Sequence, residues 1–280
     1  MTTLQAILIA LLQGATELFP ISSLGHAVIL PAVLDWQLDQ RSADFLPFLV
    51  LLHTGTALAL LLYFWRDWLG LARGVLGLDG SVQAQASRKL AVLIVVATIP
   101  AVILGYGANH FFRALFATPL FACAFLFVNG LLLLFGERLR GRIVGQTRPP
   151  GEMSITDALV IGLFQCGALF PGISRSGATI VGGLLRGFNH LDSARFSFLI
   201  ALPIIVGATV LEVPHLMHAS VPAGVLQQAV IAAVVAGVTA WLATAFLMRY
   251  FRHHDDWALN PFAIYCLVVG AGCAAYLLIR

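Results

Sequence analysis

The chain has 280 residues, of which 60% are hydrophobic and only 10% are charged, and its mean hydropathy is +0.93. A soluble domain carries roughly a quarter charged residues, so the composition excludes a soluble globular protein and predicts an integral membrane protein. The apolar runs are continuous and rich in Leu and Ala, which favours helices over an alternating β-barrel pattern. The net charge of +3 is spread over short loops, so no nucleic-acid partner is expected.

The cysteines and the N-terminus give no sign of a disulfide framework or a cleaved leader. All four cysteines fall in apolar segments and are expected to be small core residues, not disulfides or metal ligands. The first residues lack a positive region and a cleavage site, so we expect this segment to be retained. The cysteines are Cys123, Cys166, Cys266 and Cys273.

The first 34 residues contain a polar motif between two short apolar segments. Residues 4–19 and 21–34 each fall below the roughly 20 residues that a spanning helix needs. We predict a re-entrant helical hairpin whose turn carries the motif, because irregular backbone at that depth must be buried in protein or line a wet cavity. The motif runs from Gln13 to His26 and reads Gln-Gly-Ala-Thr-Glu-Leu-Phe-Pro-Ile-Ser-Ser-Leu-Gly-His.

Six longer apolar segments are predicted to cross the membrane, three after each hairpin. The connector 66–87 holds charged residues and several glycines and is expected to be a surface loop. The polar stretch 137–153 marks the boundary between the halves of a single membrane domain (1–280), about 1–140 and 150–280. The predicted spans are 44–65, 89–108, 118–136, 193–212, 224–248 and 260–279.

A degenerate copy of the first motif lies in the second half. Residues 165–179 read Gln-Cys-Gly-Ala-Leu-Phe-Pro-Gly-Ile-Ser-Arg-Ser-Gly-Ala-Thr and share Leu-Phe-Pro and Ile-Ser with the first copy. Ser154 and Asp157 have the spacing of a capping box, which predicts a helix start there and a helix that runs to Phe170. A second short helix is expected over 174–187, which completes a second re-entrant hairpin.

Basic residues are distributed unevenly over the predicted connectors. If each hairpin returns to the side from which it enters, 12 Lys and Arg lie on one face and 3 on the other, with Arg175 in the motif. The positive-inside rule makes the basic face cytoplasmic and places both termini outside. The first hairpin then enters from outside and the second from the cytoplasm, which predicts an inverted-topology repeat with a site near mid-membrane.

Both turns start a new short helix, so two helix N-termini are predicted to face one cavity. Their free N–H groups form an anion site, and Arg175 adds a guanidinium that matches phosphate oxygens. Ser23 and His26 lie one helical turn apart, as a nucleophile and its base would. Glu17 could orient His26, act as the base, or hold a divalent ion together with Gln13. The hydroxyls predicted to bind the phosphate are those of Ser22, Ser174, Ser176 and Thr179.

Structural roles are the alternative for the same residues. Ser22 and Ser176 have the character of helix caps that permit close packing. Glu17, His26 and Arg175 would then form a buried polar network that holds the hairpins together. Three ionisable groups at corresponding turns of an apolar chain favour the functional interpretation.

These motifs closely resemble the undecaprenyl-diphosphate phosphatase family of the bacitracin-resistance type. The resemblance extends over the whole chain, and the string Pro-Gly-x-Ser-Arg-Ser-x-x-Thr is its most specific part. The matching segments are Gln13-x-x-x-Glu17, Pro20-Ile-Ser22-Ser23-x-Gly25-His26, Pro171 to Thr179, Phe196 to Pro203, and Pro261 to Tyr265.

The resemblance implies hydrolysis of undecaprenyl diphosphate to the monophosphate on the outer face of the bacterial inner membrane, which recycles the lipid carrier of peptidoglycan synthesis and gives bacitracin resistance. It also implies a divalent cation, Mg²⁺ or Ca²⁺. The chain has the Gln form of the first motif, so Gln13 offers only a neutral oxygen beside Glu17. Leu49 stands where many relatives carry an acidic residue, so no acidic role carries over. The partners are the lipid substrate and membrane lipids, and a homodimer is compatible with the sequence.

The assignment of catalytic roles leaves alternatives open. Ser23 is the predicted nucleophile with His26 as its base, and a phosphoseryl intermediate is then hydrolysed by water. In the alternatives, His26 is the nucleophile or Glu17 activates water directly. Arg175 is needed in each of them, because phosphoryl transfer depends on positioning and charge stabilisation.

Three further groups contain histidines that could belong to a metal site or to the active site. The run from His253 to Asp256 is expected to be a solvated loop. His215 and His218 are expected in an external loop, where two ligands alone are a weak metal signal. His53 lies within a predicted span, where a position next to the site and an internal hydrogen bond are equally compatible with the sequence.

Two other classes of protein compete with the phosphatase. A transporter or flippase for an anionic prenyl phosphate or a small anion would also use inverted repeats with converging half-helices. A scaffold without chemistry would leave the buried Arg175 unexplained. The set of Ser23, His26 and Glu17 favours the phosphatase, since a pure transporter does not need it.

Overall fold

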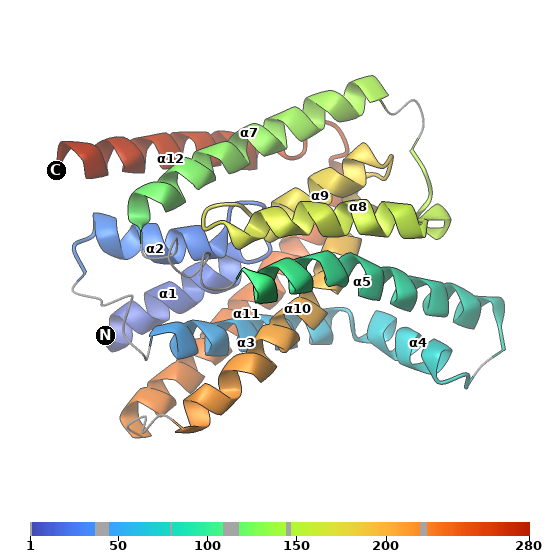
Figure 1. Ribbon diagram of the computed structural model, residues 1–280, viewed down its shortest axis with the longest axis horizontal. Coiled ribbons are helices and arrows are strands. Elements are labelled where there is room, and N and C mark those ends of the chain that lie inside the picture. The colour runs from blue at the N-terminus through green and yellow to red at the C-terminus, as the bar shows by residue number, and fades with distance from the viewer. Residues whose placement is uncertain (1, 37–44, 79, 109–117, 144–146, 219–222) are drawn as a thin grey trace.

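The computed structural model describes residues 2–36, 45–78, 80–108, 118–143, 147–218 and 223–280 (Figure 1). The regular secondary structure in these ranges is helical, and the chain is an all-α integral membrane protein. Among the described residues, five helices are long and apolar enough to cross a membrane, or six if the bent pair α3–α4 counts as one span. The five are α5 (Val82–Gly107), α7 (Pro119–Ile143), α10 (His190–His218), α11 (Ala223–His253) and α12 (Asn260–Ile279).

Two pairs of short helices lie where the hairpins were predicted. Each helix is shorter than a span, and in Figure 1 the two pairs enter from opposite ends of the long axis, with their turns near the middle. The capping box expected at the second pair is present, because Ser154 accepts from the backbone N–H of Asp157 and the Asp157 side chain accepts in return. The first pair is α1 (Thr3–Thr16) and α2 (Ser23–Val33); the second is α8 (Ile155–Cys166), a short 3₁₀ turn (Gly167–Leu169) and α9 (Arg175–Leu185).

The prediction of a surface loop over 66–87 is wrong in part. After α3 (Phe45–Tyr63) the chain forms a second helix, α4 (Trp65–Val75), at an angle of 77° to α3. The glycine Gly74 lies within this helix and has a packing role. It allows α4 to lie close to α5, because a Cβ at this position would be 2.9 Å from the carbonyl oxygen of Ala84.

Other predicted boundaries also shift. α7 continues seven residues beyond the predicted end at 136, into the polar boundary between the halves. α10 continues to His218, so His215 and His218 lie in a helix and not in the predicted external loop. The turn predicted at 109–113 lies outside the described residues.

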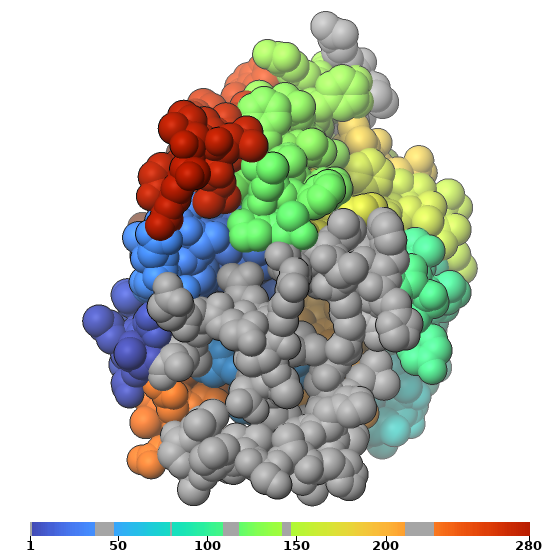
Figure 2. Space-filling model, turned by 60° about the vertical axis from the view of Figure 1, so that its left-hand side comes forward, coloured from blue at the N-terminus to red at the C-terminus, as the bar shows by residue number. Residues whose placement is uncertain are grey.

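Glycines set the close approach of the helices that carry the site. A Cβ at Gly14 would be 2.3 Å from the carbonyl oxygen of Ala236, and one at Gly55 would be 2.1 Å from that of Ala233. These contacts pack α1 and α3 onto α11. Figure 2, which turns the end with the termini forward, shows α1 next to α11 and α12 next to α7. Small residues let helix backbones approach where a larger side chain would hold them apart.

The four basic connectors gather at one end of the molecule. Side chains link them: Asp67 pairs with Arg195, and Arg140 pairs with Asp255 at 2.7 Å. Arg148 donates to the carbonyl oxygen of Arg186 at 2.9 Å. Both termini lie at the opposite end in Figure 1. The side of the membrane that each end faces stays a prediction, as do the boundaries of the two halves.

Candidate active site

The turns of the two hairpins meet inside the helix bundle. A Cβ at Gly25 would lie 2.9 Å from the Cα of Gly172, so the backbones of the two turns touch. Gly172 has φ +109°, a conformation that favours glycine, and a Cβ there would be 2.4 Å from the carbonyl oxygen of Ala122 on α7. The sequence at these two positions therefore determines how closely the motifs approach.

Asn129 on α7 joins the two turns. Its side-chain amide donates to the carbonyl oxygen of Pro20 at 2.9 Å, and its side-chain oxygen accepts from the backbone N–H of Ser174 at 2.9 Å. The side chain is fully buried. One residue thus satisfies a backbone acceptor of the first hairpin and a backbone donor of the second, groups that would otherwise be left unpaired in an apolar interior.

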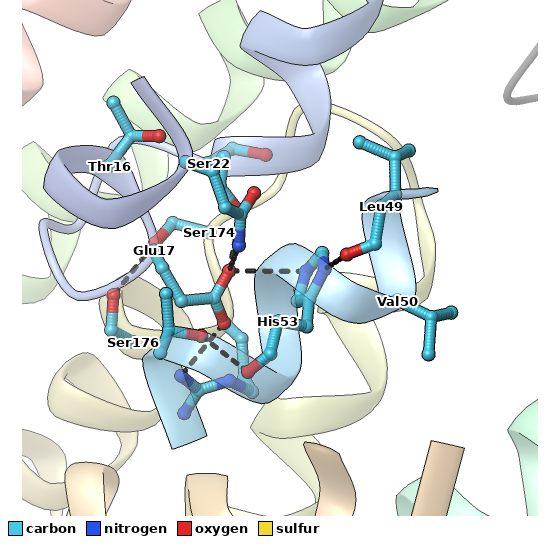
Figure 3. A network of polar contacts seen from close by, with 12 residues as sticks. Thr16, Glu17, Ser22, Leu49, Val50, His53, Ser174 and Ser176 are labelled. Atoms are coloured by element: carbon cyan, nitrogen blue, oxygen red, sulfur yellow. Dashed lines mark hydrogen bonds and ion pairs between the residues drawn. The ribbon is translucent and has the colours of Figure 1, made fainter. Parts of the chain in front are cut away.

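Glu17 is the carboxylate around which the polar side chains of the site converge (Figure 3). Its Oε2 accepts from the hydroxyl of Ser23 at 2.5 Å and from the Gln13 amide at 3.0 Å. The Nε2 atom of His53 lies 3.4 Å from the same oxygen, and Arg175 pairs with Oε1 at 3.3 Å. The side chains come from α1, α2, α3 and α9, and that of Glu17 is 7% exposed. A buried charge requires such partners.

Ser23 occupies the first position of α2, directly after a strained residue. Ser22, the N-cap, has φ 67°, an uncommon value for a residue other than glycine, and its side chain accepts from the backbone N–H of Gly25. Strained backbone often accompanies a functional site, since the surrounding structure must hold it. Here it directs the Ser23 hydroxyl toward Glu17.

His26 lies beside this cluster but does not pair with Ser23 as its spacing predicted. Its Nδ1 is 2.6 Å from the carbonyl oxygen of Ser22, and its Nε2 is 2.8 Å from the hydroxyl of Tyr265 on α12. Both ring nitrogens are therefore used. Because a carbonyl oxygen only accepts, Nδ1 carries the hydrogen, and a neutral His26 accepts from Tyr265 through Nε2.

Arg175 also reaches the third helix of the second half. Its guanidinium donates to the carbonyl oxygen of Ser197 on α10 at 3.2 Å in addition to its pair with Glu17. The side chain is 11% exposed. The guanidinium thus lies between the two hairpins and α10, next to the Ser23 hydroxyl that shares Glu17 with it.

The other hydroxyls of the second motif hydrogen-bond within the protein. Ser174 and Ser176 both donate to the carbonyl oxygen of Phe19, at 3.2 and 3.0 Å, and so tie the second turn to the first. Ser174 is also the N-cap of α9. The Thr179 hydroxyl lies 2.6 Å from that of Ser197. Their predicted role in phosphate binding stays a prediction, as does that of Ser22.

The donors near Glu17 fit a hard divalent cation in their chemistry. Gln13 gives its amide hydrogen to Glu17, and its Oε1 is buried without a hydrogen-bond partner among the described residues. A carboxylate and a neutral carbonyl oxygen are ligands that Mg²⁺ and Ca²⁺ use, Mg²⁺ commonly together with substrate phosphates. Within the described ranges, no group of three His, Cys, Asp or Glu side chains could hold a metal by itself.

Three contributors to the site were not assigned by sequence reasoning. His53 donates from Nδ1 to the carbonyl oxygen of Leu49 at 2.8 Å and presents Nε2 to Glu17, so both roles weighed for it are combined. Asn129 has no counterpart in the motifs, although a lone Asn in an apolar span is a signal of function or packing. Tyr265 belongs to a matching segment, but nothing in that segment assigns it a partner.

The run from His253 to Asp256 is more than a solvated loop. Asp255 pairs with Arg140 and lies 2.9 Å from Nδ1 of His190, and the other ring nitrogen of His190 is 2.8 Å from Glu137. This network joins α7, α10 and the turn before α12. It belongs to the basic end of the molecule, away from Glu17.

Comparison with known proteins decides the family. The family model described as bacitracin resistance protein BacA matches residues 6–272. The chain belongs to the BacA family. This confirms the resemblance found in the motifs.

Curated relatives of this BacA-family chain carry the name undecaprenyl-diphosphatase. The protein from Granulibacter bethesdensis is 60% identical, over 99% of this chain and 97% of its own length. That from Acidiphilium cryptum is 57% identical (97% and 96%), and that from Gluconacetobacter diazotrophicus is 56% identical (97% and 95%). The likeness therefore extends over both hairpins and every described helix.

Proposed function

We propose that the protein hydrolyses undecaprenyl diphosphate to undecaprenyl phosphate and inorganic phosphate, and so recycles the lipid carrier of peptidoglycan synthesis and gives bacitracin resistance. The names of its full-length relatives support this activity. The observation that carries it is the arrangement of Ser23 and Arg175 on the two oxygens of one buried carboxylate, Glu17. A hydroxyl, a base and a guanidinium within contact distance are what phosphoryl transfer to a side chain requires.

In this proposal, the Ser23 hydroxyl attacks the terminal phosphorus while its proton passes to Glu17. The bond between that phosphorus and the bridging oxygen breaks, and undecaprenyl phosphate leaves. Water then hydrolyses the phosphoserine, which releases inorganic phosphate and restores the Ser23 hydroxyl. Glu17 takes the place expected of His26, because its carboxylate and not the imidazole contacts Ser23.

Arg175 and the helix N-termini offset the charge of the diphosphate. Arg175 exchanges its pair with Glu17 for phosphate oxygens, which frees the carboxylate to accept the proton. The first turns of α2 and α9 contribute N–H groups that helix geometry leaves without intrahelical partners. Ser22, Ser174, Ser176 and Thr179 hold these turns in place, which is how we propose that they contribute to phosphate binding.

His26 remains the alternative nucleophile in this proposal. Its hydrogen bond to Tyr265 sets the orientation of the ring. A phosphoenzyme mapped by mass spectrometry to Ser23 or to His26 distinguishes the two. Direct activation of water by Glu17 would give no phosphoenzyme.

A divalent cation, Mg²⁺ or Ca²⁺, is proposed as the cofactor, with Glu17 and the free Oε1 of Gln13 as its protein ligands. When bound, it would neutralise charge on the diphosphate oxygens. The single carboxylate of this Gln form suits a cation that also binds the substrate.

The family supports the location, and the distribution of charge supports the orientation. We propose the bacterial inner membrane, with the basic end cytoplasmic, both termini outside and the site open to the outside. A homodimer is proposed as the assembly, to be measured by light scattering in detergent.

Phosphate release from undecaprenyl diphosphate by the purified chain in detergent, with Mg²⁺ or Ca²⁺, tests the function. We expect Ser23→Ala and Arg175→Ala to lose nearly all activity. Ser193→Ala is the matched control, because Ser193 is a buried serine whose hydroxyl has no partner among the described residues. A folded wild type without phosphate release would refute the phosphatase, and movement of prenyl phosphate across vesicles would then support the transporter.

A further inference from the structure

Helix α4 leaves the end of a membrane helix almost at a right angle. α3 ends at Tyr63 and α4 starts at Trp65, with the 77° bend at the residue between them. Figure 1 shows α4 at the end of the molecule opposite the termini, beside α5. If α3 crosses the membrane along its normal, the 77° bend makes α4 run nearly parallel to the membrane surface.

α4 and the residue that caps its C-terminus carry an exposed apolar stripe. Trp65, Leu69 and Leu76 are 53%, 41% and 70% exposed, and their spacing places them on one helical face. Leu58 and Leu62, on the last two turns of α3, are 55% and 67% exposed, so the helix that precedes α4 also has exposed apolar side chains. The side of α4 that carries Gly74 packs against α5, so the stripe lies on a different side of the helix and is partly exposed.

Two arginines lie along one edge of the stripe. The Arg66 guanidinium lies over the Trp65 ring, 5.3 Å from its centroid, and Arg73 follows seven residues later on the same side. The single acidic residue of the helix, Asp67, pairs with Arg195 on α10 and so contributes no free negative charge. An apolar face bordered by Arg is typical of a helix that lies in the membrane interface and attracts anionic lipids.

We propose that α4 is an interfacial helix that binds anionic phospholipid, with Trp65, Leu69 and Leu76 in the acyl boundary and Arg66 and Arg73 on the headgroup phosphates. The lipid is assigned as occupant because the exposed apolar stripe lies on a helix that directly follows an apolar, membrane-inserted helix, and because positive charge borders one edge of it. Lipid binding by α4 is expected in either orientation of the protein in the membrane and does not depend on the proposed enzymatic activity.

The test uses the full-length protein in vesicles that contain brominated lipid, which quenches tryptophan fluorescence on contact. Brominated phosphatidylglycerol, which is anionic, and brominated phosphatidylcholine are compared at equal mole fraction. We expect stronger quenching by phosphatidylglycerol, and Trp65→Phe should remove most of this excess. Trp257→Phe is the matched control, because Trp257 is 55% exposed but lies in the turn before α12.

The charge on α4 is tested by replacing Arg66 and Arg73 with Gln. Each basic residue at a membrane surface contributes about 1 kcal/mol, so relative affinity for the anionic lipid should fall about fivefold for each arginine removed. Replacement of both arginines by Lys, which keeps the charge, should leave most of the preference. Equal quenching by the two lipids, or an unchanged preference in the double Gln variant, would overturn the proposal. A change from dimer to monomer in Trp65→Phe would overturn it in favour of a second copy.

Discussion

The carboxylate of Glu17 determines the chemistry of the site, because three other helices supply groups that depend on it. Ser23, His53 and Arg175 all contact it; Glu17 and Ser23 are buried, and His53 and Arg175 are mostly buried. Removing one partner of a buried charge leaves that charge uncompensated and is strongly destabilising. Conservative replacements therefore test the site better than truncations.

Arg175→Lys separates charge from geometry. A lysine keeps the positive charge but cannot reach both the Glu17 carboxylate and the carbonyl oxygen of Ser197, as the guanidinium fork does. We expect kcat for phosphate release to fall by about 10²–10³-fold, as for other lost transition-state donors. Arg252→Lys, an exposed residue, is the control. Near wild-type kcat in Arg175→Lys would show that the fork is not used.

His53 is expected to hold Glu17 in place through its Nε2. His53→Leu removes the contact, and we expect kcat to fall by roughly tenfold to a hundredfold through loss of positioning. His53→Gln keeps an N–H donor of similar reach and should retain more activity. Thr54→Val is the control, because it removes neighbouring hydrogen bonds to the carbonyl oxygen of Val50 and the hydroxyl of Thr209 but no contact with Glu17. If Leu and Gln reduce kcat equally, the contact with Glu17 does not position the carboxylate.

At the scale of the elements, the second hairpin depends on its tight turn. Gly172→Ala would place a Cβ 2.4 Å from the carbonyl oxygen of Ala122 in a backbone conformation unfavourable to alanine. We expect a loss of about 2–4 kcal/mol in the free energy of unfolding. The measurement is thermal unfolding in detergent. Gly107→Ala is the matched control, since a Cβ at Gly107 meets open space, and an equal Tm for both variants would contradict the argument.

At the scale of the whole molecule, a cluster at the basic end makes stability depend on pH. Asp157 is fully buried and pairs with Arg148 at 3.0 Å and Arg186 at 2.6 Å. Burial by itself would raise the pKa of Asp157, but hydrogen bonds from Ser154 and the two arginines outweigh it and hold the pKa well below its ordinary value. A group with a lowered pKa stabilises the fold above its unfolded pKa and loses this contribution as the pH falls.

We therefore expect the Tm in detergent to be steady from neutral pH to about pH 5 and to fall below about pH 4. Asp157→Asn should be less stable at pH 7 by about 1–3 kcal/mol, and its Tm should fall less in acid. Asp256→Asn, at an exposed position, should follow the wild type. An identical acid response of wild type and Asp157→Asn would assign the transition to other carboxylates.

Sequence reasoning recovered the parts of the fold that local pattern determines. The short apolar runs around Pro20 and Pro171 predicted both hairpins, since neither run can cross a membrane. The helix α4 was missed because glycines and charges suggested a loop, whereas close packing on α5 makes those glycines part of a helix. The pairing of the two turns followed from their shared motif, and not from any single residue.

The partners within the site were harder to predict. Ser23 and His26 have the spacing of a pair, but the His26 ring bonds back to the carbonyl oxygen of Ser22 and across to Tyr265. Contacts such as that of His53 with Glu17 join different helices. Helix packing determines these contacts, and the periodicity of the sequence does not show which helices pack together.

The ion pair of Glu17 and Arg175 has a consequence for how the protein is made. The two residues are 158 positions apart, one in each hairpin. At synthesis rates of about 5–20 residues per second, Arg175 emerges roughly 8–30 s after Glu17. During that interval Glu17 lacks the guanidinium and has only partners from the first half of the chain, such as Ser23 and His53. The first hairpin should therefore take its final place in the bundle only when the second hairpin arrives.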